Sequence, residues 1–353
     1  NTPRIDFSDS TNGALLLEGQ STNLITQSEL FSDSYWTKGG SSVVSGFTSP
    51  SGGLNAFKLV EDTSTSDHIL FKNIAAADGL SHTFSVLVKP AGRTSIQIYN
   101  GDLDEQSSFF NLTTKTIVNG SSVVSSNIRE LTDGWFKCSV TTTNSKKKIY
   151  IKLYNGTTAY YTGDGTSGVY VYGAQLEQNS YPTSYIPTFG STVTRLADVC
   201  NNSGSAQDFN SEEGVLYLEA KVKTDDIFAA NCIAVSDGTD TNRLSIIMYG
   251  NINSIRASMN VGGVSQFDFN LPSGYIQEQY YKIAVSYKVN DCKIFINGTK
   301  ISTDTSATMP SLGTFDRLNL DLGQGSYDFY GKVKDLQVFT EAKSDEQLAA
   351  LTS

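Results

Sequence analysis

The chain has 353 residues, a formal net charge of −10 and only 18% charged residues. An acidic surface repels phosphate backbones and anionic lipid headgroups, so it disfavours nucleic acids and membrane surfaces as partners but admits neutral ligands such as sugars. No apolar run approaches the ~18 residues that a membrane-spanning helix needs. The length suits two domains. Because the chain does not begin with methionine, we expect it to be part of a longer protein.

The composition favours strands and turns over helices. Aromatic residues make up 11% of the chain, mostly Tyr and Phe, and there are 30 glycines. Such a mixture is typical of many short strands joined by polar turns. The cysteines Cys138, Cys200, Cys232 and Cys292 lie far apart and lack the close spacing of zinc ligands, so we expect them to behave as small apolar side chains.

The first half of the chain consists of strand-sized runs separated by Gly, Asn, Asp or Ser. These runs span residues 3–7, 14–20, 55–62, 68–74, 82–90, 94–100, 107–114, 134–143, 147–156 and 168–177. A spacing of about ten residues between short strands is typical of an antiparallel sandwich. Within residues 94–100 the alternation predicts that Ile96 and Ile98 face inward while Gln97 and Tyr99 face outward.

Residues 170–198 read YVYGAQLEQNSYPTSYIPTFGSTVTRLAD, and they close the first set of strands. Pro182 and Pro187 lack amide donors and favour extended backbone before them, so this segment is predicted to be a stiff connector.

The second half has the same organisation with a different sequence. Its predicted strands span residues 214–223, 231–238, 243–250, 254–261, 280–289, 292–298, 317–323 and 331–339. Asn297-Gly298 is a type I′ hairpin signal. Ser344, with Gln347 three residues later, forms a capping-box pattern that predicts one short C-terminal helix.

Two resemblances cover most of the chain. Residues 20–180, through TNLITQSELFSDSYWTK, FKLVED, HTFSVLVKP, DGWFKCSVTTT and VYVYGAQLE, resemble a carbohydrate-binding-module-type jelly roll. Residues 208–352, through DFNSEEGVLYLEAKVK, YYKIAVSYKVNDCKIFINGTKI and YGKVKDLQVFTEAKSDEQLAALT, resemble a laminin-G-like (concanavalin-A-like) domain. Together with the flanking segments they resemble bacteriophage tail-fibre and head-fibre proteins.

The resemblances imply an all-β fold with two consecutive antiparallel β-sandwiches, a jelly roll and then a concanavalin-A/laminin-G-like domain. The expected divisions are an N-terminal β arm, the jelly roll, a proline-containing connector and the laminin-G-like sandwich, at residues 1–22, 23–180, 181–207 and 208–353. The implied role is a virion module on the tail or capsid surface, assembled in the host cytoplasm. Its expected partners are bacterial surface polysaccharide, other virion proteins and copies of itself, with a trimer favoured.

No catalytic constellation is recognisable in the sequence. Paired carboxylates with the E-x-D-x-x-E spacing of retaining glycosidases do not occur. The two histidines, His68 and His82, are too few for a His-rich site, and His68, after a polar loop, is expected to face solvent or to lie in a turn. We therefore expect a non-enzymatic binding module, with a structural decoration protein and a polysaccharide-active enzyme as alternatives.

Sugar binding depends on aromatic rings flanked by polar side chains. If the strands at residues 94–100 and 147–156 are neighbours, then Gln97, Tyr99, Tyr150, Lys152 and Tyr154 form a shallow sugar-binding platform. The alternative is that these tyrosines only cover the sheet or pack beneath a neighbouring chain.

A polar loop supplies a second set of candidate ligand-binding residues, Tyr160, Tyr161 and Asp164. They either form an exposed pair of tyrosines with a carboxylate, or belong to a loop that folds back on the sandwich. No cofactor is required, but similar jelly rolls often hold a structural Ca²⁺ ion, which the resemblance places at Glu29 and Glu177 near the two ends of the first module.

Overall fold

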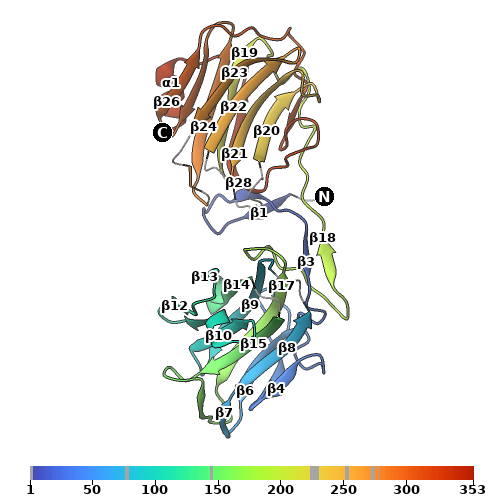
Figure 1. Ribbon diagram of the computed structural model, residues 1–353, viewed down its shortest axis with the longest axis vertical. Coiled ribbons are helices and arrows are strands. Elements are labelled where there is room, and N and C mark those ends of the chain that lie inside the picture. The colour runs from blue at the N-terminus through green and yellow to red at the C-terminus, as the bar shows by residue number, and fades with distance from the viewer. Residues whose placement is uncertain are drawn as a thin grey trace. The chain divides into compact units, whose positions relative to one another are not determined.

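The computed structural model describes residues 3–75, 79–143, 146–222, 230–250, 254–271, 275–276 and 278–353. The chain forms two compact units, each built from antiparallel β-sheets (Figure 1). The first sandwich comprises residues 20–196, and the second comprises residues 1–19 with residues 197–353. The predicted all-β class with consecutive sandwiches is therefore confirmed.

The first sandwich has two six-stranded sheets. One has the order β12-β11-β10-β15-β8-β4, made by Thr116–Asn119, Ser107–Asn111, Ser95–Asn100, Lys146–Tyr154, Ile69–Ala75 and Thr37–Gly39. The other has the order β13-β14-β9-β17-β6-β5, made by Ser125–Glu130, Phe136–Thr142, His82–Ala91, Gly168–Glu177, Ala56–Glu61 and Ser41–Phe47. Two smaller pairs join β16 (Tyr160–Thr162) to β7 (Thr65–Asp67) and β18 (Val193–Arg195) to β3 (Ser21–Asn23).

The core of the first sandwich lies between its two large sheets. Ile96 and Ile98 of β10 are fully buried there, as the alternation predicted, and so is Ile149 of β15. They meet apolar residues of the opposite sheet, including Phe84 of β9. Every second residue of β10 and β15 must therefore lie on the outer face of their sheet.

The second sandwich has a seven-stranded and a five-stranded sheet. The larger has the order β1-β2-β28-β19-β24-β25-β26, made by Arg4–Asp6, Ala14–Leu17, Gly331–Phe339, Glu213–Val222, Tyr281–Lys288, Cys292–Ile296 and Thr299–Asp304. The smaller has the order β23-β22-β21-β20-β27, made by Val264–Leu271, Ser254–Val261, Arg243–Tyr249, Ala230–Ser236 and Arg317–Asn319. The N-terminal arm thus belongs to the second sandwich, where β2 pairs with β28.

Local signals in the second half have the predicted geometry. Asn297 and Gly298 have φ values of 47° and 80°, both in the left-handed region that a type I′ turn requires. Ser344 caps helix α1 (Asp345–Leu351), and Gln347 completes the capping box. Among the residues described, no helix is long and apolar enough to cross a membrane.

Candidate functional site: an aromatic face on the first sandwich

Strands β10 and β15 are neighbours, which brings the predicted platform residues together. Their register places Tyr99 opposite Tyr150, Gln97 opposite Lys152, and Ser95 opposite Tyr154. Because the alternate isoleucines of both strands are in the core, these side chains share the outer face of the sheet.

Adjacent strands extend this set of rings on both sides. Phe71 of β8 stacks on Tyr150 with ring centroids 5.2 Å apart, and Tyr99 lies 5.2 Å from Tyr150 on the other side. Phe109 of β11 contacts Tyr154 at 4.6 Å. We call these five residues the aromatic face. Sequence reasoning missed Phe71 and Phe109, although each lies at the outward position of a run that was predicted to be a strand.

Two lysines lie over these rings. The Lys148 ammonium is 4.8 Å from the Tyr150 ring centroid and 5.0 Å from that of Phe71. The Lys152 ammonium lies 5.6 Å from the Tyr99 ring centroid and forms an ion pair with Asp67 at 3.0 Å. Cation–π contacts of this kind hold the ammonium groups beside the rings, where they can donate hydrogen bonds to a ligand.

The members of the aromatic face differ in exposure. Tyr99 is buried and its hydroxyl donates to Asp104, so it forms the floor of the face. Burial, and then the Asp104 carboxylate, raise the pKa of Tyr99, so its phenol stays neutral. Tyr150 and Tyr154 are half-buried, and the Tyr154 hydroxyl donates to the Thr157 carbonyl at 2.5 Å. Gln97 donates to the Ser107 hydroxyl at 2.8 Å.

The loop tyrosines have separate environments. Tyr160 is 63% exposed, whereas Tyr161 is buried and donates its hydroxyl to Glu61 at 2.6 Å. Tyr160 pairs with Asp67 across β16 and β7, and the Asp67 carboxylate contacts Lys152, so Tyr160 borders the aromatic face. The loop folds back at Tyr161 and leaves one exposed ring.

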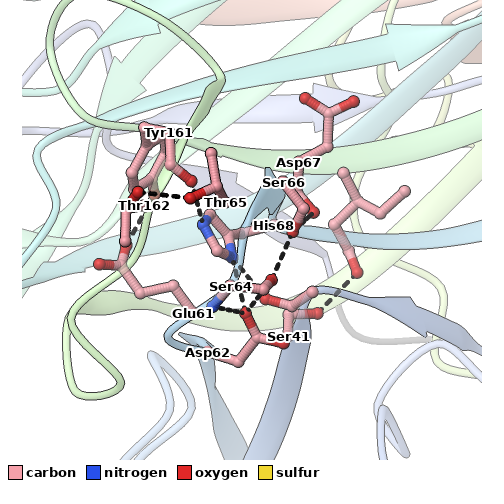
Figure 2. A network of polar contacts seen from close by, with 12 residues as sticks. Ser41, Glu61, Asp62, Ser64, Thr65, Ser66, Asp67, His68, Tyr161 and Thr162 are labelled. Atoms are coloured by element: carbon pink, nitrogen blue, oxygen red, sulfur yellow. Dashed lines mark hydrogen bonds and ion pairs between the residues drawn. The ribbon is translucent and has the colours of Figure 1, made fainter.

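Glu61 organises the buried side of that loop (Figure 2). Arg93 donates from Nε to Glu61 Oε2 at 2.8 Å and from Nη2 to Oε1 at 2.5 Å, and the Asp164 amide donates to Oε1 at 2.9 Å. Asp164 is exposed, and its Oδ1 accepts hydrogen bonds from its own turn, including one from the Ser167 amide at 2.6 Å. These contacts fix the loop that carries Tyr160.

The expectation that His68 faces solvent is wrong, because its side chain is fully buried. Its Nδ1 lies 2.5 Å from the Gly40 carbonyl oxygen and its Nε2 lies 3.2 Å from that of Tyr161 (Figure 2). The polar loop before it folds over the ring, with Asp62 Oδ1 at 3.6 Å from Nδ1.

Glu29 and Glu177, the predicted calcium ligands, are buried and have different protein partners. Glu29 accepts hydrogen bonds from the Tyr172 hydroxyl at 3.0 Å and from the Asn55 amide at 2.8 Å. Glu177 accepts one from Ser21 at 2.6 Å. Among the described residues, no group of three or more His, Cys, Asp and Glu side chains is placed to hold an ion, and the calcium ion stays a prediction.

Residues 216–349 match the family model of the concanavalin A-like lectin/glucanases superfamily. The second sandwich is a concanavalin A-like domain. This match confirms the laminin-G-like fold predicted for the second half, and it agrees with the expectation of a non-enzymatic binding module. No curated protein matches the chain in sequence.

Solved structures resemble parts of the chain at low identity. The CBM40 module of the Ruminococcus gnavus IT-sialidase is 18% identical with a TM-score of 0.37, and the match covers 44% of this chain and 95% of that module. Domain 4 of AbnA, a GH43 extracellular arabinanase from Geobacillus stearothermophilus, is 14% identical with a TM-score of 0.36. That match covers 46% of this chain and 73% of the arabinanase domain. Sheep galectin-11 is 11% identical with a TM-score of 0.28, and the match covers 41% of this chain and 99% of the galectin.

Proposed function

We propose that the chain is a non-enzymatic glycan-binding module and that the aromatic face is its binding surface. The observation that carries this proposal is two sets of contacting rings on the outer face of β8, β10, β11 and β15, with two lysines beside the larger set. One set is Phe71, Tyr150 and Tyr99, and the other is Phe109 and Tyr154. The apolar face of a pyranose stacks on aromatic rings, and flanking donors bind its hydroxyl groups.

The arrangement suits a shallow site on an extended glycan. Tyr150 and Tyr154 offer partly exposed rings, Lys148 offers donors, and Tyr160 offers an exposed ring at the border of the face. Such a site has modest affinity for one sugar unit, so several copies in an oligomer would compensate through multivalency.

We further propose that the module belongs to a phage fibre on the virion surface, as a trimer that binds bacterial surface polysaccharide. The sequence resemblance supports this context. The exposed side chains of Phe189, at 70%, and Val193, at 38%, favour a second role, packing against neighbouring virion proteins without glycan binding.

A glycan array followed by calorimetric titration of the full chain tests the binding function. We expect binding to a bacterial polysaccharide, and Tyr150→Ala should weaken it about tenfold, or about 1.4 kcal/mol, because the ring that contacts both Phe71 and Tyr99 is lost. Tyr170→Ala is the matched control, since Tyr170 contacts Phe47 on the opposite sheet of the same sandwich. An array without any binding, or equal affinities of the Tyr150 variant and the wild type, would contradict the proposal.

A further inference from the structure

His68 is fully buried at the place where three polar segments of the first sandwich meet (Figure 2). Its own backbone belongs to the sheet, because its carbonyl oxygen accepts the Leu153 amide of β15 at 2.9 Å. Its ring contacts the bend at Gly40, the loop after β6 at Asp62, and β16 at Tyr161. One side chain therefore joins segments that are 28 and 93 residues away from it in sequence.

Both ring nitrogens of His68 face oxygen atoms that can only accept hydrogen bonds. Nδ1 lies 2.5 Å from the Gly40 carbonyl oxygen and Nε2 lies 3.2 Å from the Tyr161 carbonyl oxygen, and both contacts have hydrogen-bond geometry. A carbonyl oxygen has no proton to donate. For both contacts to be hydrogen bonds, each ring nitrogen must therefore carry a proton.

A neutral imidazole does not satisfy this arrangement. It has one N–H donor and one nitrogen whose lone pair accepts. In either tautomer one lone pair would point at a carbonyl oxygen, which is unfavourable in a buried site. Turning the ring over would place carbon atoms at both oxygens instead. The imidazolium, which donates from both nitrogens, is the form of the ring that fits both carbonyl oxygens.

A carboxylate beside the ring supplies a counter-charge. Asp62 Oδ1 lies 3.6 Å from Nδ1 of His68. Hydrogen bonds from Ser64, the largest cause, lower the pKa of Asp62, so this carboxylate is ionised. A carboxylate at such a distance favours the imidazolium, whereas burial of the ring opposes it. Asp62 and the two carbonyl oxygens therefore act together against the cost of burial.

The other ionisable side chains around the ring are engaged with one another. The Tyr161 ring lies 4.6 Å from the His68 ring, between centroids. The pairs are Tyr161 with Glu61, Glu61 with Arg93, and Asp67 of β7 with Lys152 of β15. These pairs leave Asp62 as the carboxylate that faces the imidazole.

The loop after β16 closes tightly over the ring at Gly163. A Cβ at this position would lie 2.9 Å from Cε1 of His68 and 2.0 Å from the Asp62 carbonyl oxygen. The Gly163 amide donates to the Ser64 carbonyl oxygen at 3.2 Å. This hydrogen bond joins the two loops that cover the ring, so exchange of the Gly163 amide reports whether they are closed.

We propose that His68 is held as an imidazolium at neutral pH and that its two protons latch the loop that carries Tyr160 onto the first sandwich. The proton on Nε2 holds the Tyr161 carbonyl, and the proton on Nδ1 holds the Gly40 carbonyl. Loss of either proton turns one hydrogen bond into a contact between a lone pair and an oxygen, which releases the loop. This latch does not depend on glycan binding.

Nitrogen NMR of the full chain, labelled with ¹⁵N-histidine, counts the protons on the ring. The chain has only two histidines, His68 and His82, and the signals that disappear in His68→Gln identify the first. At neutral pH we expect both His68 nitrogens to have the shifts of protonated nitrogens. One protonated and one unprotonated nitrogen would overturn the proposal.

Hydrogen exchange of the Gly163 amide tests the latch. Its protection factor, corrected for the intrinsic exchange rate, should fall about tenfold between a pH below and a pH above the loss of the His68 proton seen by NMR. The Gly120 amide, which donates to the Ser107 carbonyl oxygen at 2.8 Å, is the internal control and should keep its protection. Unchanged Gly163 protection, or an equal loss at Gly120, would overturn the latch.

Two glutamine variants separate the latch from burial of a histidine in general. In His68→Gln, Gly163 protection should be low on both sides of that pH, because one amide nitrogen does not replace two ring donors. His82→Gln is the matched control, since His82 is buried in the same sandwich and its Nδ1 contacts the Leu80 carbonyl oxygen. It should leave Gly163 protection and its pH dependence unchanged. If His68→Gln does not fold, the wild-type comparison of Gly163 with Gly120 decides.

Discussion

At the scale of residues, Glu61 is a buried acidic side chain whose effect on stability can be tested. It is only 1% exposed, and it accepts hydrogen bonds from Arg93, Tyr161 and the Asp164 amide. Burial opposes its ionisation, but the hydrogen bonds from Arg93 and its other donors outweigh burial and lower the pKa of Glu61 below its ordinary value of 4.5. The charged form is therefore favoured in the folded state.

Glu61→Gln should destabilise the first sandwich by about 3–5 kcal/mol at neutral pH, because it leaves the Arg93 charge without its buried partner. Since the folded pKa is lowered, the contribution of the carboxylate is complete above about pH 4.5 and is lost as the pH falls through the folded pKa. The difference between variant and wild type in urea unfolding should therefore shrink in acid.

Glu130→Gln is the control for that experiment. Glu130 pairs with Lys115 on the surface, with both side chains about half exposed, so its loss should cost at most about 1 kcal/mol. A Glu61 variant as stable as the Glu130 variant at neutral pH would show that the buried pair contributes no more than a surface pair.

At the scale of elements, the hairpin between β25 and β26 depends on its turn. Gly298 has φ +80°, and an added Cβ would lie 3.4 Å from the Ser353 hydroxyl oxygen, so there is room for it. The loss of stability in a Gly298 variant is therefore set by the left-handed backbone conformation. Gly298→Ala should destabilise the second sandwich by about 1 kcal/mol in denaturant unfolding. Gly19→Ala, whose Cβ would make an ordinary 3.6 Å contact with the Tyr330 ring, should be nearly neutral. If the two variants lost equal stability, the left-handed turn at Gly298 would not be the cause of the loss.

The sequence predicted the apolar central strands well and the polar edge strands poorly. Alternation located β10 and β15 because their isoleucines face the core. It missed β12 and β13, which are largely exposed strands at sheet ends, where few apolar residues are needed. The sequence alone did not predict that β10 pairs with β15, because the pairing and register of strands that are distant along the chain depend on the whole fold.

At the scale of the whole molecule, the second sandwich is assembled from both ends of the chain. Residues 1–19 join residues 197–353, with β2 paired to β28 and Leu17 in the core at 5% exposure. Strand patterns predicted an arm here, but they could not assign it to either sandwich, since its partner strand lies more than 300 residues away.

This division predicts separable effects of core substitutions. Both tryptophans, Trp36 and Trp135, lie in the first sandwich, so tryptophan fluorescence reports its unfolding alone, whereas calorimetry reports both sandwiches. Leu17→Ala should reduce the free energy of unfolding of the second sandwich by about 2–5 kcal/mol. It should therefore lower the midpoint temperature of a calorimetric transition that tryptophan fluorescence does not report. Leu59→Ala, at a fully buried site of the first sandwich, should instead shift the fluorescence transition. If Leu17→Ala shifted the fluorescence midpoint as much as the calorimetric one, the two sandwiches would unfold as a single cooperative unit, because a loss of packing in one would then be transmitted in full to the other.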